Sequence, residues 1–76
     1  MNLRDCKKLN VGDRFRRPSL NYWCEYGVTE TDSDERGMYA FTAHDEQGHR
    51  CRVSFVIWDQ RSLIDPKRWM KDAERC

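Results

Sequence analysis

Apolar and polar side chains alternate most regularly in the stretch RCRVSFVIW, residues 50–58. Apolar side chains occupy every second position from residue 51 to residue 57, and arginine or serine separates the first three of them. A period of two is typical of a β-strand with one buried face. We therefore predict a strand here, with these side chains directed into the core: Cys51, Val53, Phe55 and Ile57.

Three further stretches have the pattern of strands: VGDRFRR at 11–17, YWCEYGVT at 22–29 and MYAFTA at 38–43. The inward positions are predicted to be Val11, Asp13 and Phe15 in the first stretch and Tyr22, Cys24, Tyr26 and Val28 in the second. Turn-forming residues separate the stretches. ETDSDERG, 30–37, is predicted to be a loop closed by Gly37. In HDEQGH, 44–49, Gly48 can take the left-handed conformation of a hairpin turn.

The last part of the chain, LIDPKRWMKDAERC, has the signals of a helix start. Asp65 is a good N-cap, and Pro66 suits the first helical position. Ile64 and Trp69 are spaced as a hydrophobic staple on either side of the cap. We predict a helix over 65–75 whose inward side chains are Trp69, Met70 and Ala73.

Short connections between consecutive strands predict an antiparallel meander that curls round one core. The predicted fold is mainly β: a small antiparallel four- to five-stranded SH3-like barrel, or a curled meander, with a short C-terminal helix. The chain of 76 residues is expected to be one domain. Within it we expect a lead-in at 1–10, the barrel at 11–58 and the helix at 65–75.

VGDRF, the tryptophan that follows it and the two glycine-closed turns resemble an SH3-like barrel. More narrowly, GDRFRRPS followed by Trp23, and later GMYAFTA, is similar to the plasmid-borne trimethoprim-resistance dihydrofolate reductases, which are SH3-like barrels of nearly this length. The catalytic strand of that family carries Val-Gln-Ile-Tyr, whereas this chain has Val53-Ser54-Phe55-Val56. The resemblance therefore supports the fold and argues against that activity.

Composition favours a folded chain, since 38% of the residues are hydrophobic and three are tryptophan. No apolar run approaches the roughly 20 residues that cross a bilayer, and the first ten residues lack the apolar segment of a signal peptide. We therefore expect a cytoplasmic protein that does not contact membranes. In that compartment the four cysteines are expected to be free thiols, with Cys24 and Cys51 as small core residues.

Charge is unevenly distributed although the net charge is only +1. Residues 1–24 hold six basic and two acidic side chains, and residues 47–76 hold seven basic and four acidic ones. Residues 25–46 hold one basic and seven acidic side chains. Blocks of opposite sign influence the choice of partner and the rate of association.

No complete catalytic or metal motif is present. His44, His49 and Cys51 are close in sequence, but their spacing matches no familiar zinc site, so we expect no metal and no cofactor. Cys51 is predicted to lie within a strand on the buried face, where a thiol is inert. We therefore expect that the protein is not an enzyme.

Two groups of charged residues are candidate binding surfaces. The first is acidic and would bind a basic surface of a protein partner: Glu30, Asp32, Asp34, Glu35, Asp45 and Glu46. The second is an alternative surface for single-stranded nucleic acid, through phosphate contacts and base stacking: Arg14, Arg16, Trp23, Arg50 and Arg52.

The sequence therefore predicts a non-catalytic interaction module, a small inhibitor or adaptor that binds a basic surface of a nucleic-acid-processing protein. The alternative is a small barrel that binds single-stranded nucleic acid. A short, dense domain without a cofactor motif resembles, in style, the accessory inhibitors of phages and other mobile elements, such as anti-CRISPR proteins.

Overall fold

The computed structural model describes all residues from 1 to 76. The elements, in chain order, are α1 (Leu3–Cys6), β1 (Arg14–Pro18), β2 (Trp23–Ser33), β3 (Tyr39–Asp45), β4 (Arg50–Ser54), α2 (Pro66–Met70) and β5 (Glu74–Arg75). No helix of the structure has the length and apolar character needed to cross a membrane.

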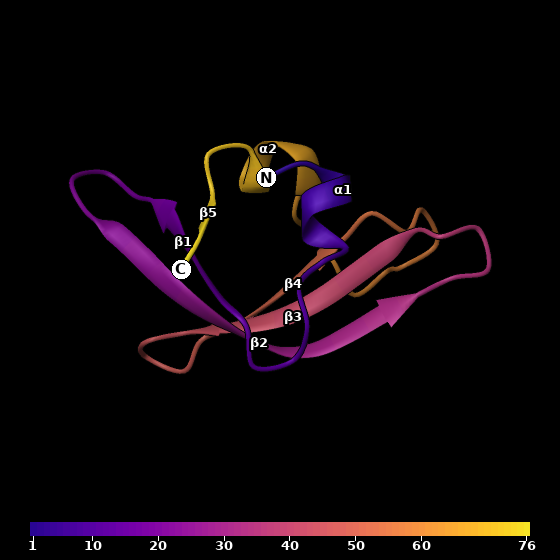
Figure 1. Cartoon of the computed structure of the whole chain (residues 1–76), viewed down its shortest axis with the longest axis horizontal. Helices are drawn as coiled ribbons and strands as arrows, with labels where there is room; N and C mark the ends of the chain where they lie inside the picture. The colour runs from indigo at the N-terminus through magenta and orange to yellow at the C-terminus, as the bar shows by residue number, and fades with distance from the viewer.

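The five strands form one antiparallel sheet in the order β4-β3-β2-β1-β5. The first four strands follow one another as hairpins, and β5 returns from the C-terminal end to pair with β1 (Figure 1). β4 and β5 form opposite edges, so the sheet is not closed. The prediction of a mainly β, antiparallel fold with a short helix near the C-terminus is confirmed, in its open meander form.

One apolar core lies between the sheet and the two helices, which cover the same face of the sheet (Figure 1). Phe15 is central, and its ring lies 5.3 Å from the ring of Tyr26 and 5.6 Å from that of Phe41, measured between centroids. The predicted core positions Phe15, Val28, Val53 and Phe55 are buried, and Tyr26 packs against them.

Three predicted inward positions, Val11, Tyr22 and Ile57, are wrong because their side chains are exposed. The side chain of Ile57 is 96% exposed, because β4 ends at Ser54 and the chain then leaves the plane of the sheet. The Ser54 hydroxyl accepts a hydrogen bond from the Val56 amide at 3.0 Å, which fixes this change of direction. Val11 is also exposed, because β1 begins only at Arg14.

The N-terminal segment 1–10 is more than a lead-in, because it forms α1 and supplies part of the core. Cys6 and Leu9 are fully buried, and the Tyr39 hydroxyl donates to the Leu9 carbonyl at 2.8 Å. The buried thiol is thus Cys6, whereas Cys24 and Cys51, predicted to be core residues, are half-buried.

The predicted loop over 30–37 is largely strand. β2 continues through Ser33, so Glu30 lies opposite Thr42 and Asp32 lies opposite Ala40 on β3. Only residues 34–37 form the turn, which Gly37 closes with a φ of 81°. A bulge between residues 28 and 30 shifts the register of β2 against β3.

The C-terminal helix begins as predicted but ends early. The Asp65 side chain caps α2 by accepting from the Arg68 amide at 3.4 Å, and Pro66 is the first helical residue. The prediction that the helix continues over residues 71–75 is wrong. Glu74 and Arg75 pair with β1 instead, as strand β5. An ion pair of 2.7 Å between Arg16 and Glu74 accompanies this pairing.

Candidate functional site

The face of the sheet opposite the helices has no covering element (Figure 1). Outward side chains from β1 to β4 form a polar face, which the loop 55–64 partly covers at Arg52, and this face contains most of the residues predicted to bind a partner. The register places Glu30, Thr42 and Arg52 in one row across β2, β3 and β4. Carboxylates of β2 can thus reach arginines of β4 over the small side chain of Thr42.

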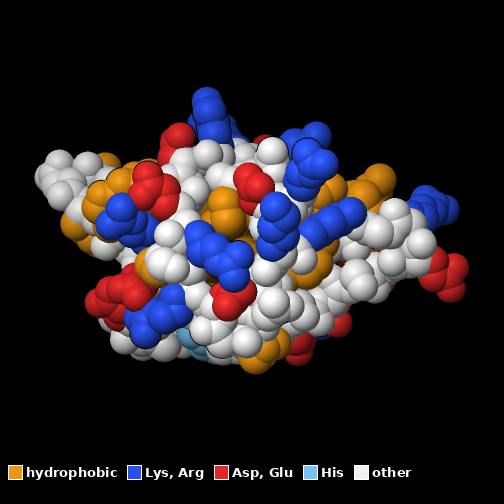
Figure 2. Space-filling view, in the orientation of Figure 1, with side chains coloured by type: hydrophobic (Ala, Val, Ile, Leu, Met, Phe, Trp, Pro, Cys, Tyr) orange, Lys and Arg blue, Asp and Glu red, His pale blue; other side chains and the backbone are white.

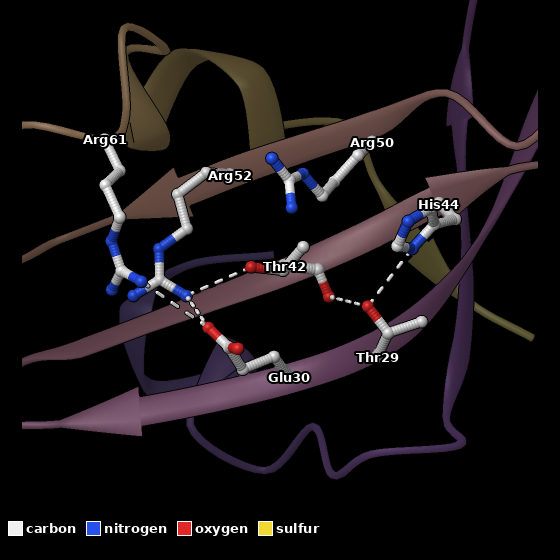
Figure 3. Close-up of a pocket in the computed structure, with 7 residues that line it drawn as sticks. All are labelled: Thr29, Glu30, Thr42, His44, Arg50, Arg52 and Arg61. Atoms are coloured by element: carbon white, nitrogen blue, oxygen red, sulfur yellow. Dashed lines mark hydrogen bonds and ion pairs between the residues drawn. The ribbon is translucent and has the colours of Figure 1, made fainter.

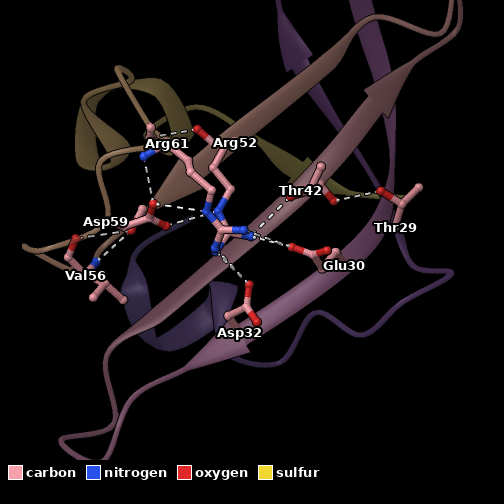
Figure 4. A network of polar contacts seen from close by, with 10 residues as sticks. Thr29, Glu30, Asp32, Thr42, Arg52, Val56, Asp59 and Arg61 are labelled. Atoms are coloured by element: carbon pink, nitrogen blue, oxygen red, sulfur yellow. Dashed lines mark hydrogen bonds and ion pairs between the residues drawn. The ribbon is translucent and has the colours of Figure 1, made fainter.

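Arg52 lies at the centre of an ion-pair network on this face (Figure 4). Its Nη2 lies 2.7 Å from Asp32 Oδ2, and its Nη1 lies 3.2 Å from Glu30 Oε1 and 3.1 Å from Thr42 Oγ1. Its Nε donates to Asp59 Oδ2 at 3.1 Å. Only 9% of the Arg52 side chain and 3% of the Asp59 side chain are exposed.

These contacts shift the pKa values of the network residues. The hydrogen bond from Arg52 is the largest cause that lowers the pKa of Asp32. Burial opposes ionisation of Asp59, but hydrogen bonds from the Arg61 amide and from Arg52 outweigh it and lower the pKa of Asp59. Burial likewise opposes the charge of Arg52, yet its bonds to the carboxylates raise the pKa of Arg52. All three groups are therefore charged at neutral pH.

The two predicted binding surfaces are not separate in the structure, because the network contains residues of both. Arg52 was assigned to the nucleic-acid surface, whereas Glu30 and Asp32 were assigned to the acidic surface, and the structure pairs them with each other. Arg61 adds a second guanidinium, 3.7 Å from Glu30 and 3.4 Å from Asp32. These carboxylates already have cationic partners, so they are not a free acidic patch.

A polar hollow of about 590 Å³ lies beside the network (Figure 3). Within it the Arg50 guanidinium makes no hydrogen bond or ion pair inside the chain, whereas Thr29 Oγ1 lies 3.1 Å from His44 Nδ1. The hollow has no hydrophobic lining residue, and it is formed by Thr29, Glu30, Thr42, His44, Arg50, Arg52 and Arg61. Arg50 is therefore the free cation of this face.

The remaining residues of the predicted nucleic-acid surface lie across the sheet from Arg50. Arg14 pairs with Glu25 at 2.6 Å, and Arg16 pairs with Glu74. The Arg16 guanidinium also lies 4.4 Å from the centre of the Trp23 ring. Because β2 and β3 separate β1 from β4, the predicted arginines form two groups and most of them are paired.

The two acidic turns, DERG at 34–37 and DEQG at 45–48, have the same geometry. The Asp34 carboxylate accepts from the amides of Arg36 and Met38, and the Asp45 carboxylate accepts from the amides of Gln47 and His49. Each aspartate thus has a structural role in its turn. Glu35 and Glu46, one position later, are exposed and make no hydrogen bond or ion pair.

The turns differ in their surroundings. β2 extends past the end of β3, so Trp23 and Glu25 lie beside the turn that contains Glu46. A hollow of about 180 Å³ separates them, and its lining combines aromatic, acidic and polar residues: Tyr22, Trp23, Cys24, Glu25, Asp45, Glu46 and Gln47. Tyr22 and Trp23 are 62% and 45% exposed. We call this hollow the aromatic–acidic hollow.

The histidines and cysteines do not come together as a metal site. His44 contacts Thr29, whereas His49 lies 3.3 Å from the Asp45 carboxylate. No group of three or more potential metal-ligating side chains is present.

Sequence reasoning did not single out Asp59, Arg61 or Tyr22. No local pattern marks Asp59, whose burial depends on the path of the loop 55–64. Tyr22 was assigned to the buried face by alternation, yet β2 begins one residue later and Tyr22 is exposed.

No protein family, curated protein or solved structure matches this chain.

Proposed function

We propose that this chain is a non-catalytic protein-binding module, a small inhibitor or adaptor that binds a basic surface of a nucleic-acid-processing protein. The aromatic–acidic hollow carries the proposal. It places two exposed aromatic rings, Tyr22 and Trp23, beside the carboxylates of Glu25, Asp45 and Glu46. A lysine or arginine of a partner would find both a π-face and opposite charges there.

Trp23 already holds a guanidinium in this manner. Arg16 lies 4.4 Å from the centre of the ring while it pairs with Glu74 at 2.7 Å. Within the hollow, Glu25 has a partner in Arg14, whereas Glu46 has none. Glu46 therefore offers the free charge, and Tyr22 and Trp23 offer the contact area that aromatic residues supply at binding surfaces.

The opposite turn is the weaker candidate within the predicted acidic group. Glu35 is exposed like Glu46, but Asp32 beside it is paired with Arg52 and Asp34 holds the turn. The exposed pair Tyr22 and Trp23 lines the hollow beside Glu46 instead. We therefore assign binding to the hollow that Glu46 lines rather than to the segment 30–35.

The two acidic turns have the same geometry, so Glu46 and Glu35 allow a matched comparison of two variants. We would titrate isotope-labelled chain with an arginine-rich peptide and follow the indole N–H signals of Trp23, Trp58 and Trp69. The proposal expects a selective shift of the Trp23 signal, weaker binding after Glu46→Lys, and little change after Glu35→Lys. The affinity should also fall with added salt, and less steeply after Glu46→Lys. Equal losses in both variants, or no shift of Trp23, contradict the proposal.

Single-stranded nucleic acid is the second candidate ligand, because Arg50 is unpaired in a hollow with polar walls and phosphate is the natural partner of such a guanidinium. An unstructured oligothymidine, added in place of the peptide, tests it. Binding that is lost after Arg50→Gln, and that is unaffected or strengthened by Glu46→Lys, would favour this candidate over the first.

A further inference from the structure

The first residues of β2 have a neighbouring strand on one side only. Residues 23–27 pair with β1, but the pairing of β2 with β3 begins only at Tyr26. Beyond that point β3 ends in the turn 45–48, and the β1–β2 and β3–β4 hairpins diverge (Figure 1). Residues 23–25 therefore form an open edge beside the aromatic–acidic hollow.

The direction of the hydrogen bonds shows which main-chain groups this edge leaves free. The Val28 amide donates to the Asp13 carbonyl at 2.8 Å, on the side of β1. Alternate residues of a strand direct their N–H and C=O groups to the same neighbour, so Cys24 also faces β1. The N–H and C=O groups of Trp23 and Glu25 then point to the other side, where no strand is present.

Main-chain groups without a partner on a strand are a template for a further strand. An extended segment that continues the line of β3 would run antiparallel to β2 and exchange hydrogen bonds with Trp23 and Glu25. The segment residues directly opposite these two would place their side chains on the same face of the sheet, next to the Trp23 ring and the Glu25 carboxylate. Every second side chain of the segment would thus contact this face.

The side chains beside the open edge favour basic residues in the segment. A hollow of about 290 Å³ next to the edge is lined by the carboxylates of Glu25, Asp45 and Glu46. Its only guanidinium belongs to Arg14, which pairs with Glu25 and leaves Glu46 free. Figure 2 shows hydrophobic and charged side chains side by side at this end of the molecule. An arginine or lysine there would meet both opposite charge and the face of Trp23.

We infer that an extended segment of the partner, with arginine or lysine at alternate positions, pairs with residues 23–25 as an additional antiparallel strand. The inference rests on the proposed function, since it assigns the same basic partner to the same hollow, and it adds the mode of binding. Recognition then requires free N–H groups in the segment as well as positive charge. Attraction between side chains alone does not impose the first requirement.

Matched N-methylated peptides separate the two requirements. The parent probe is a blocked peptide, Thr-Arg-Val-Arg-Val-Thr, and its two derivatives are methylated on the amide nitrogens of both arginines or of both valines. In the antiparallel pairing the arginine N–H groups face Trp23 and Glu25, whereas the valine N–H groups face away. Methylation of the arginines should weaken binding at least about tenfold, because two main-chain hydrogen bonds are lost. Methylation of the valines, which leaves the charge and these bonds in place, should not.

Hydrogen exchange of the chain's own amides gives an independent measurement. In the free chain the amides of Trp23 and Glu25 should exchange quickly, whereas the Cys24 amide is paired with β1 and should be protected. A saturating amount of the parent peptide should slow exchange at Trp23 and Glu25 much more than at Cys24. Thermal unfolding is not needed as a control, because the chain itself is unchanged throughout.

The outcomes distinguish the mode of binding from the proposed function. Equal binding of the two methylated peptides, or a larger loss for the valine derivative, overturns the antiparallel pairing while a shift of the Trp23 indole signal still supports the proposed function. A parent peptide that does not shift this signal contradicts both. Protection of the Trp23 and Glu25 amides that rises with protein concentration, without peptide, also overturns the inference, because a second copy of the chain would then occupy the edge.

Discussion

Arg52 and Asp59 form a buried ion pair, with 3.1 Å between Nε and Oδ2, that joins the edge strand β4 to the loop 55–64. A buried charge is costly unless it is fully hydrogen-bonded, and here both groups are. Asp59 also accepts from the Arg61 amide, and Arg52 also pairs with Glu30 and Asp32. The network therefore determines how the polar face is organised and where the loop is placed.

Asp59→Asn is expected to lower the free energy of unfolding by about 2 kcal/mol, because it weakens a charge-assisted hydrogen bond to a guanidinium that water reaches poorly. The matched control is Asp72→Asn, which removes the same charge at an exposed position with no hydrogen bond or ion pair, and which should change stability little. Urea denaturation of the three proteins measures the difference. Equal stability of the two variants would show that the pair does not hold the loop.

Stability should fall in acid through the same network. The pKa values of Asp32 and Asp59 are lowered below the ordinary 3.8 in the folded chain. A lowered folded-state pKa contributes stability that is fully present well above pH 4 and is lost as the pH falls through the folded-state values. The melting temperature should therefore decrease below about pH 4, and less steeply in Asp59→Asn than in the parent. A parallel decrease in both proteins would assign the acid sensitivity to other carboxylates.

The strands could be predicted because their period of two is a local property of the sequence. Phe15, Val28 and Val53 are buried as the alternation indicated. The alternation failed at strand ends, where it continues in the sequence after the strand has stopped. Residues 53–56 are four consecutive buried residues, which shows that the chain leaves the sheet there, and Ile57 consequently points to solvent.

Phe55 and Ile57 provide a direct comparison of two positions that the sequence pattern treats as equivalent. Phe55→Ala is expected to destabilise the fold by about 3–5 kcal/mol, since it removes a buried ring from a small core. Ile57→Ala should change stability by less than about 0.5 kcal/mol, because its side chain is exposed. Far-UV circular dichroism with thermal melts distinguishes them, and similar losses in the two variants would contradict the described end of β4.

The candidate site was less predictable than the strands, because it depends on pairing between distant residues. Glu30 and Arg52 are separated by a whole strand, and only the register of β2, β3 and β4 places both beside Thr42. The bulge after Val28 helps set that register, and no sequence signal marks it. The same holds for β5, where Glu74 pairs with β1 although the local sequence favoured a helix.

The four thiols should react in an order set by burial. Cys76 is exposed, whereas Cys6 is fully buried and burial raises the pKa of its thiol to about 11. Because the thiolate is the reactive form, alkylation should modify Cys76 first and Cys6 last, with Cys24 and Cys51 between them. Timed alkylation of the native protein followed by mass spectrometry gives the order. Early modification of Cys6 would indicate that α1 opens readily from the core.

The acidic segment 30–35 should divide into residues that stabilise the fold and one that does not. Asp32 accepts from Arg52 at 2.7 Å, and because its side chain is half exposed we expect Asp32→Asn to cost no more than about 1 kcal/mol. Glu35→Gln removes the same charge from an exposed side chain without a partner, so its stability should equal that of the parent. Denaturation in low and high salt measures both effects, and the cost of Asp32→Asn should shrink as salt screens the pair. If Glu35→Gln proves as costly as Asp32→Asn, the loss of stability comes from net charge and not from the contact with Arg52.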